Sequence, residues 1–180
     1  MREKKSTLSF FDLPFLECKV IENDSCALYM VVVRIEDYGK LLSDNGGRLR
    51  RDLFDADGWD FLWTNQTNEE IACVLADPAA LWQMSTSVTI IATNATVLGN
   101  IIRLQDIQII NGLRTTRIVY HYFQDGSATS EDRELFVQII VTPDEQARDQ
   151  IIRATSIQGR RLTAADLQAA RFHHCRCRGK

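Results

Sequence analysis

The residues best suited to bind an anion lie in the stretch Asp106–Phe123, DIQIINGLRTTRIVYHYF. Apolar residues alternate up to Ile110, as in a strand that enters a core, and Asn111-Gly112 then interrupts the pattern as a tight turn does. Beyond the turn the apolar spacing is that of a helix. A helix that starts here brings backbone N–H groups without helical partners, and the hydroxyls of Thr115 and Thr116, to the positive end of its dipole. This geometry suits a phosphate, and an ordinary strand-to-helix connection has the same spacing.

No second group of residues has the spacing of a catalytic or metal site. His121 is the only histidine outside the last ten residues, and no nucleophile lies near it in the sequence. Residues 173–177 (HHCRC) offer two histidines and two cysteines, but a tetrahedral zinc site normally uses two separated pairs of ligands. The sequence therefore predicts no catalytic residue and no metal ligand, and it identifies no cofactor.

Composition predicts a soluble chain of about one domain. Of the 180 residues, 45% are hydrophobic and 25% are charged, and no apolar run approaches the roughly 20 residues that span a bilayer. The N-terminus starts with basic residues, but Asp12, Pro14 and Glu17 interrupt any signal-peptide core. The five cysteines form no CxxC pair, and their odd number favours free thiols. We therefore expect a cytoplasmic protein without a membrane segment.

Charge is distributed unevenly along the chain. The net charge is −3, and the last ten residues, RFHHCRCRGK, carry four basic groups and no acid, so the other 170 residues sum to about −7. An acidic body disfavours a broad nucleic-acid-binding face without excluding a local basic site. One small basic cluster does occur, and it is interpreted as a solvated surface paired with neighbouring aspartates. It consists of Arg48, Arg50 and Arg51 beside Asp52 and Asp55.

Strand and helix signals alternate along the chain. Strands are predicted over residues 27–35, 88–92, 96–98, 101–104, 107–110 and 135–141. Helices are predicted over residues 36–42, from 67 to the residues before Pro78, 113–123, from 143 through 154, and 163–170. Thr142 fits the N-cap of the fourth helix, with Pro143 as its first residue and Glu145 as the capping-box partner.

This alternation predicts a mixed α/β fold, in which a mixed sheet with flanking helices surrounds one core. We divide the chain into an irregular N-terminal segment (residues 1–25), an α/β domain (residues 26–170) and a disordered basic tail (residues 171–180). The Asp106–Phe123 stretch then supplies a central strand and the helix that follows it.

Three stretches resemble a known family. They are, in order, VTIIATNATVLGN, LQDIQIINGLRTTRIVYHYF and VQIIVTPDEQARDQIIRATSIQ, and a looser likeness extends from Phe10 to Ala170. They resemble the AIPR (abortive infection phage resistance) proteins, which are bacterial, usually much longer than 180 residues and associated with phage defence. The resemblance implies a truncated relative or a fragment with a partial domain, so that the remainder of the parent protein is missing. The INGLRTT stretch is its most specific part, and by analogy the family signature looks like the Asp-Gly-Gln-Gln-Arg motif of ParB-like proteins, some of which bind or hydrolyse nucleotides.

The chain departs from the family pattern at four polar places. Arg114 stands where the family commonly has glutamine, and Ser85-Thr86-Ser87 stands where Asn-Asn-Gly is typical. Asp57-Gly58-Trp59 replaces Asn-Val-Arg, and Ser156-Ile157-Gln158 replaces Asn-Ser-Gln. The apolar scaffold is kept while polar groups have changed, which indicates a lost active site on a retained fold.

Arginine is permanently charged and only donates hydrogen bonds, so Arg114 cannot orient a water by accepting one. It can still bind a phosphate, although a surface arginine on a helix is the favoured interpretation of Arg114. Arg153 in the retained RAT is a second candidate anion contact, and its alternative is an ordinary last-turn arginine favoured by the helix dipole. The predicted function is an AIPR-like phage-defence protein that binds a phosphate or nucleotide without turning it over. The alternative is a non-enzymatic remnant or protein-interaction module that retains only the fold. The predicted binding residues are Asn111, Gly112, Arg114, Thr115, Thr116 and Arg153.

Overall fold

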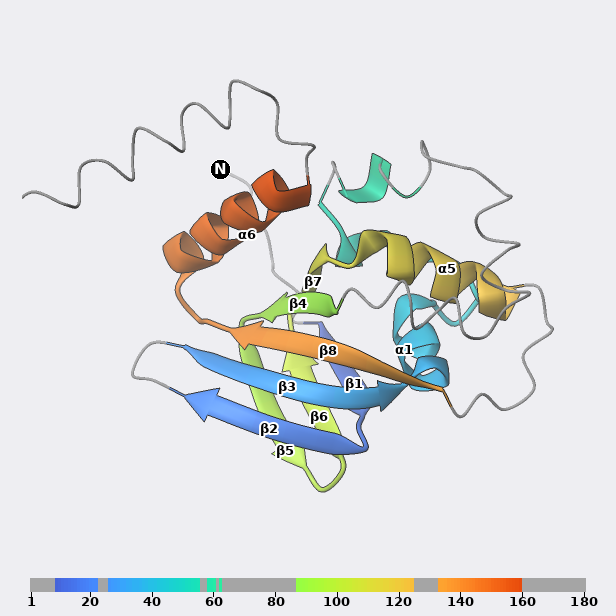
Figure 1. Ribbon diagram of the computed structural model, residues 1–180, viewed down its shortest axis with the longest axis horizontal. Helices are drawn as coiled ribbons and strands as arrows, with labels where there is room; N and C mark the ends of the chain where they lie inside the picture. Colours follow the sequence, from blue (N-terminus) through green and yellow to red (C-terminus); the bar gives the residue numbers. More distant parts are fainter. Residues whose placement is uncertain are drawn as a thin grey trace, which may run out of the picture.

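Two β-sheets form the framework of the protein, which is seen here in a computed structural model (Figure 1). The structure describes residues 9–22, 26–55, 58–60, 62, 87–124 and 133–159, with side chains described as far as residue 155. The helices expected from residue 67 and over residues 163–170, and the basic tail over residues 171–180, lie outside the described residues. Within the described part of the chain, no helix is long and apolar enough to cross a membrane.

The smaller sheet has three antiparallel strands in the order β1–β6–β5. The larger has five strands in the order β2–β3–β8–β4–β7, and it is mixed because β4 runs parallel to β8 while the other neighbours are antiparallel. The strands of the smaller sheet are β1 (Phe10–Pro14), β5 (Asn94–Leu98) and β6 (Ile101–Gln105). Those of the larger sheet are β2 (Glu17–Glu22), β3 (Ala27–Arg34), β4 (Val88–Ala92), β7 (Gln108–Asn111) and β8 (Glu134–Val141).

Helices pack against the sheets and against one another. The longer helices of the described residues are α1 (Ile35–Leu42), α5 (Leu113–Gln124) and α6 (Glu145–Gly159), and a short 3-10 helix, η1 (Arg51–Leu53), follows α1. α1 packs against α5, and α6 packs against β7 (Figure 1). The mixed α/β fold with flanking helices and one core is therefore confirmed.

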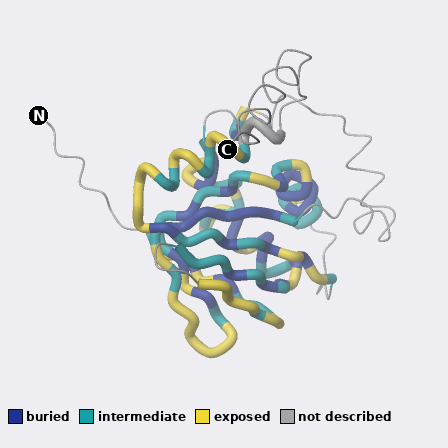
Figure 2. Tube along the Cα trace, turned by 60° about the vertical axis from the view of Figure 1, so that its left-hand side comes forward, coloured by how far each residue is buried: buried dark blue, intermediate teal, exposed yellow. Residues whose placement is uncertain are grey.

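The core lies between the two sheets because apolar side chains alternate along their inner faces. In β3, Val31 and Val33 are buried, and in β8 the same is true of Val137 and Ile139, while their neighbours are more exposed. β4 is buried at every position, as expected for a strand with neighbours on both sides and cover on both faces. Figure 2 shows the buried positions gathered in the middle of the molecule and exposed ones along outer strands and loops.

Three local predictions differ from the structure. β7 is an edge strand and not a central one, because it pairs with β4 alone. Ile109 in β7 and Ile107 just before it are nevertheless buried, and α6 packs against the strand. Residues 10–14 and 17–22, expected to be irregular, form β1 and β2. β2 shows no apolar alternation because it is exposed on both faces, so its sequence carries little signal.

The third difference concerns the start of α6. Thr142 is buried, and its backbone N–H donates to the carbonyl of Ala92 at 3.0 Å, so it still extends the pairing of β8 with β4. Asp144 caps the helix instead, because its Oδ1 accepts from the backbone N–H of Gln146 at 3.0 Å. The helix therefore begins at Glu145, two residues later than the capping box predicts.

Candidate functional site

The candidate site is the turn between β7 and α5, where Gly112 joins the last strand residue, Asn111, to the first helix residue, Leu113. The predicted change from strand to helix at Asn111-Gly112 is confirmed. Gly112 has a φ of +81°, in the left-handed region that glycine adopts without steric cost. The chain can turn sharply here only because of that conformation.

Gly112 is also packed against the start of β4. A Cβ added to it would lie 2.8 Å from the Cα of Val88, 2.9 Å from the Cγ2 of Val88 and 3.3 Å from the carbonyl oxygen of Ser87. Real Cβ atoms do not approach backbone atoms this closely, so no other residue fits without movement of β4. The position of the first turn of α5 is therefore set by the backbone of two strands.

Thr116 joins this turn to the protein interior. Its backbone N–H and its hydroxyl both donate to the carbonyl of Gly112, at 2.9 and 3.0 Å. The Tyr38 hydroxyl lies 2.7 Å from Thr116 Oγ1, and since the single Thr116 proton is used on Gly112, Tyr38 is the donor. Tyr38 is fully buried, and this burial raises the pKa of its hydroxyl. Through these buried hydrogen bonds, Thr116 connects the turn at Gly112 to Tyr38 in α1.

The predicted binding residues divide into buried and exposed groups. Thr115 and Thr116 are buried, at 4% and 0% exposure, whereas Asn111 and Arg114, on either side of Gly112 and Leu113 in the sequence, are exposed. Asn111 Oδ1 accepts from the backbone N–H of Gly112 at 2.8 Å, which orients its side chain toward the helix start. Arg153 is exposed on α6, the helix that packs against β7, and its contact with a ligand stays a prediction.

The first turn of α5 differs electrostatically from those of the other helices. α1 has Glu36 and Asp37 in its first turn and α6 has Glu145, whereas α5 has no acidic residue there. An acidic side chain in this position offsets the positive end of the helix dipole. At the start of α5 that positive end is reinforced by Arg114 instead.

Segments far apart in the sequence meet at this turn. The carbonyl of Ser87 lies beside Gly112, and a Cβ at Gly58 would lie 3.6 Å from the Cδ1 of Leu113. Gly58 begins a short helical segment at residues 58–60, where its N–H donates to Asp55 Oδ1 at 2.6 Å. Gly58 and Ser87, each from a stretch that departs from the family pattern, therefore lie beside the turn at Gly112 and Leu113. Residues 57, 85 and 86 and the side chains of 156–158 lie outside the described part.

Sequence reasoning missed two arginines near this site. Arg117, in α5, is only 4% exposed, although arginine is rarely buried this deeply. Arg148, in α6, donates from Nη2 to the carbonyl of Asp106 at 2.9 Å, and burial lowers the pKa of its guanidinium. The sequence contains only a weak signal that Arg117 is buried: it lies on the same face of the predicted helix as Leu113 and Tyr120.

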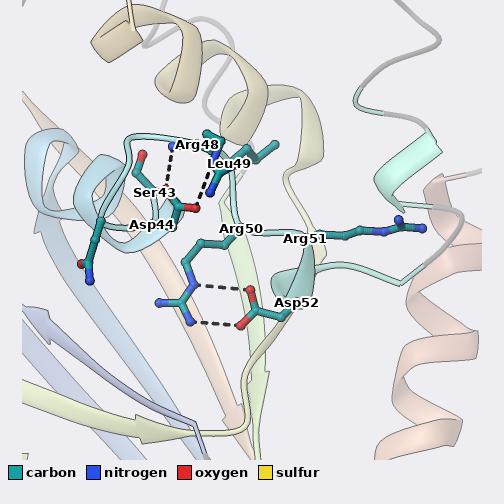
Figure 3. A pocket seen from close by; sticks show the side chains of 8 residues that line it. Ser43, Asp44, Arg48, Leu49, Arg50, Arg51 and Asp52 are labelled. Carbon is teal, nitrogen blue, oxygen red and sulfur yellow. Dashed lines mark hydrogen bonds and ion pairs between the residues drawn. The ribbon is translucent and has the colours of Figure 1, made fainter.

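The basic cluster forms a separate pocket of about 590 Å³ in the loop between α1 and η1 (Figure 3). Arg50 pairs with Asp52 at 3.0 Å, and Arg48 pairs with Asp44 at 3.4 Å. Asp44 Oδ1 also accepts from the backbone N–H of Arg48 at 2.9 Å, which lowers the pKa of its carboxyl. The prediction of a solvated, ion-paired cluster is thus confirmed for Asp52, whereas Asp55 caps the helical segment at Gly58. Two guanidinium groups of this pocket are therefore already paired with carboxylates.

Metal chemistry finds no support in the described residues, where no three histidine, cysteine, aspartate or glutamate side chains are grouped to hold an ion. The HHCRC segment lies outside them. His121 is partly buried on α5 with its ring 5.5 Å from that of Tyr120, in an edge contact.

Comparison with known proteins gives one match. The model of the family described as AIPR protein matches residues 65–176, which is more than half of the chain. No curated protein and no solved structure matches the chain. The matched range includes β4 to α6, and with them the turn at Gly112.

Proposed function

This chain belongs to the AIPR family, and we propose that it acts in phage defence by binding a phosphate-bearing ligand, such as a nucleotide, at the first turn of α5. The family is associated with abortive infection and phage resistance. The observation that carries the proposal is the turn at Gly112, which places the start of α5 between the exposed Asn111 and Arg114 without an acidic residue to offset the helix dipole.

Different groups at the turn contribute in different ways. The first-turn N–H groups of α5 have no acceptors within the helix, and they are the general reason that helix starts bind phosphates. The exposed Arg114 adds a bidentate, charge-assisted donor. Asn111 offers an exposed amide beside them, so a phosphate here would meet donors from both the backbone and side chains.

The buried threonines have a supporting role in this proposal. The Thr116 hydroxyl is bonded to Gly112 and Tyr38, so it fixes the turn and does not face a ligand. A site built in this way is preorganised, because the backbone that binds the phosphate does not have to be ordered on binding.

We infer that binding occurs without turnover. A glutamine at position 114 could orient a water beside the phosphate, whereas an arginine can only donate to the phosphate itself. Gly58 and Ser87, which belong to two altered stretches, lie beside the same turn, and this nearness supports a common site for the changes. Arginine retains binding, and the acceptor that hydrolysis requires is absent from that position.

Titration calorimetry with ATP and with inorganic phosphate tests the proposal. Arg114→Glu reverses a charge at the turn and is expected to weaken binding about tenfold or more at low salt. Arg48→Glu is the matched control, because its side chain is 85% exposed and lies in the loop pocket. Weakening by Arg48→Glu with no effect of Arg114→Glu would move the site to that pocket and overturn the proposal. No binding of either probe would favour the alternative, a remnant that retains only the fold.

A further inference from the structure

The edge strand β2 presents an open pairing surface. It ends the five-stranded sheet and pairs with β3 on one side. Five of its six residues are exposed, including Val20 at 40% and Ile21 at 52%. An edge strand carries N–H and C=O groups that point away from the sheet and can pair with another strand.

Charges on β2 alternate along one face. The register with β3 is regular from Glu17 to Glu22, so Glu17 and Lys19 share one face of the sheet and Cys18 and Val20 share the other. Within the described chain, Glu17 and Lys19 take part in no ion pair. Because Glu17 and Lys19 carry opposite charges, β2 can pair antiparallel with an identical strand so that each glutamate faces a lysine.

We propose that β2 pairs with β2 of a second copy of this chain, antiparallel, about a two-fold axis centred on Cys18. Such an axis is perpendicular to the sheet, so each residue faces one from the same face of the other copy. Centred on Cys18, it places Glu17 of each copy opposite Lys19 of the other, which forms two opposite-charge pairs.

The neighbouring registers lack this complementarity. An axis centred on Lys19 would place the two Lys19 side chains opposite each other, and like charges directly opposite are destabilising. An axis centred on Val20 would place Lys19 opposite Ile21, so neither Glu17 nor Lys19 would face an opposite charge of the second copy.

This contact is independent of the ligand proposal, because β2 and β7 are the two opposite edges of the same sheet. A dimer formed through β2 leaves the start of α5 accessible in both copies. Failure of one proposal therefore says nothing about the other.

Sedimentation equilibrium of the full chain tests the dimer. We expect a monomer–dimer equilibrium that Lys19→Glu weakens about tenfold or more at low salt, because both charge pairs become repulsive. The double variant Glu17→Lys with Lys19→Glu restores both pairs and is expected to recover the original dissociation constant within about threefold. Arg48→Glu makes the same charge change away from β2 and is expected to have no effect. Circular dichroism confirms that each variant is folded.

The register has a separate test. In an antiparallel pair, residues directly opposite have Cα atoms about 4.5–5.5 Å apart, which a disulfide can span. Cys18 is a free thiol in the structure, so mild oxidation is expected to crosslink the dimer through Cys18, and Cys18→Ser is expected to abolish that crosslink. A chain that stays monomeric at every concentration, a dimer insensitive to Lys19→Glu, a double variant that does not recover, or a dimer that Cys18 does not crosslink would overturn the proposal.

Discussion

The replacement of Gly112 by alanine measures how firmly the start of α5 is held. A non-glycine residue at a φ of +81° costs about 1–2 kcal/mol, because its Cβ is forced toward the following carbonyl. The new Cβ would also lie 2.8 Å from the Cα of Val88, a backbone atom that cannot rotate away. Relieving such a contact by backbone movement typically costs a further 1–3 kcal/mol, roughly. We therefore expect a loss of about 2–5 kcal/mol in the free energy of unfolding.

Gly99 provides the matched control for this estimate. It also has a positive φ, of +63°, but a Cβ added to it would meet no atom within 4 Å. Gly99→Ala therefore carries the conformational cost alone, about 1–2 kcal/mol. Both substitutions stiffen the unfolded chain in the same way, so that contribution cancels in the comparison.

Urea denaturation, followed by circular dichroism, measures both variants under the same conditions. The difference between Gly112→Ala and Gly99→Ala is the packing contribution of Val88 and Ser87, and we expect about 1–3 kcal/mol. Equal losses for the two variants would refute the close approach of Gly112 to β4. A neutral Gly112→Ala would refute the positive φ as well.

Three further predictions concern Thr116, Asp12 and the proposed lack of turnover. Thr116→Val removes the hydroxyl that accepts from buried Tyr38, so we expect the free energy of unfolding to fall by roughly 1–3 kcal/mol. Thr116→Ser keeps a hydroxyl and is expected to lose much less, and thermal unfolding measures both variants. The pKa of Asp12 is lowered by its hydrogen bonds to Arg103, so its stabilising effect is full above the unfolded pKa of about 3.9 and is lost as pH falls through the folded value. Asp12→Asn is therefore expected to lower Tm slightly at pH 7, with a difference that shrinks below about pH 4 and in high salt. A phosphate-release assay with ATP is expected to show no turnover in this chain, and turnover above background would contradict the inactive site. The comparison variant restores family-type residues through Arg114→Gln, Ser85→Asn, Thr86→Asn and Ser87→Gly.

The sequence predicted most elements because their local signals agreed with their final burial. The change of apolar spacing at Asn111-Gly112 located the end of β7 and the start of α5, since a period of two cannot continue as a helix. The apolar runs that form β3, β4 and β8 are buried in the larger sheet, as their composition predicts. These signals are local, and each was resolved without knowledge of the neighbouring strand.

What the sequence could not supply was the order of the strands and the contacts between distant segments. β2 has no apolar alternation because five of its six residues are exposed and only Cys18 packs against the core, so nothing in ECKVIE distinguishes a strand from a loop. The cap of α6 moved to Asp144 because Thr142 is paired to Ala92, 50 residues earlier in the chain. Cover of β7 by α6 likewise depends on tertiary packing, which made an edge strand look central.

The turn at Asn111-Gly112 was located correctly in the chain, but the burial of the side chains around it could not be read from residue types. Thr115 and Thr116 have the hydroxyls of a phosphate site, and only the structure shows that both are buried. The nearness of Gly58 and Ser87 to the turn was equally unpredictable, since they precede Gly112 by 54 and 25 residues and only the tertiary fold brings them to it.

Two different constraints act on the residues at the start of α5. Gly112 and Thr116 are held by backbone geometry and buried hydrogen bonds, which exist whether or not a ligand is bound. Arg114 is exposed, so exchange between glutamine and arginine at this position changes the fold little while it changes what the turn can do to a phosphate. A phosphate held by backbone N–H groups does not depend on that exchange, whereas an oriented water does. Under the proposed function, phosphate binding therefore persists without turnover, because the backbone groups proposed to bind the phosphate are also those that set the fold.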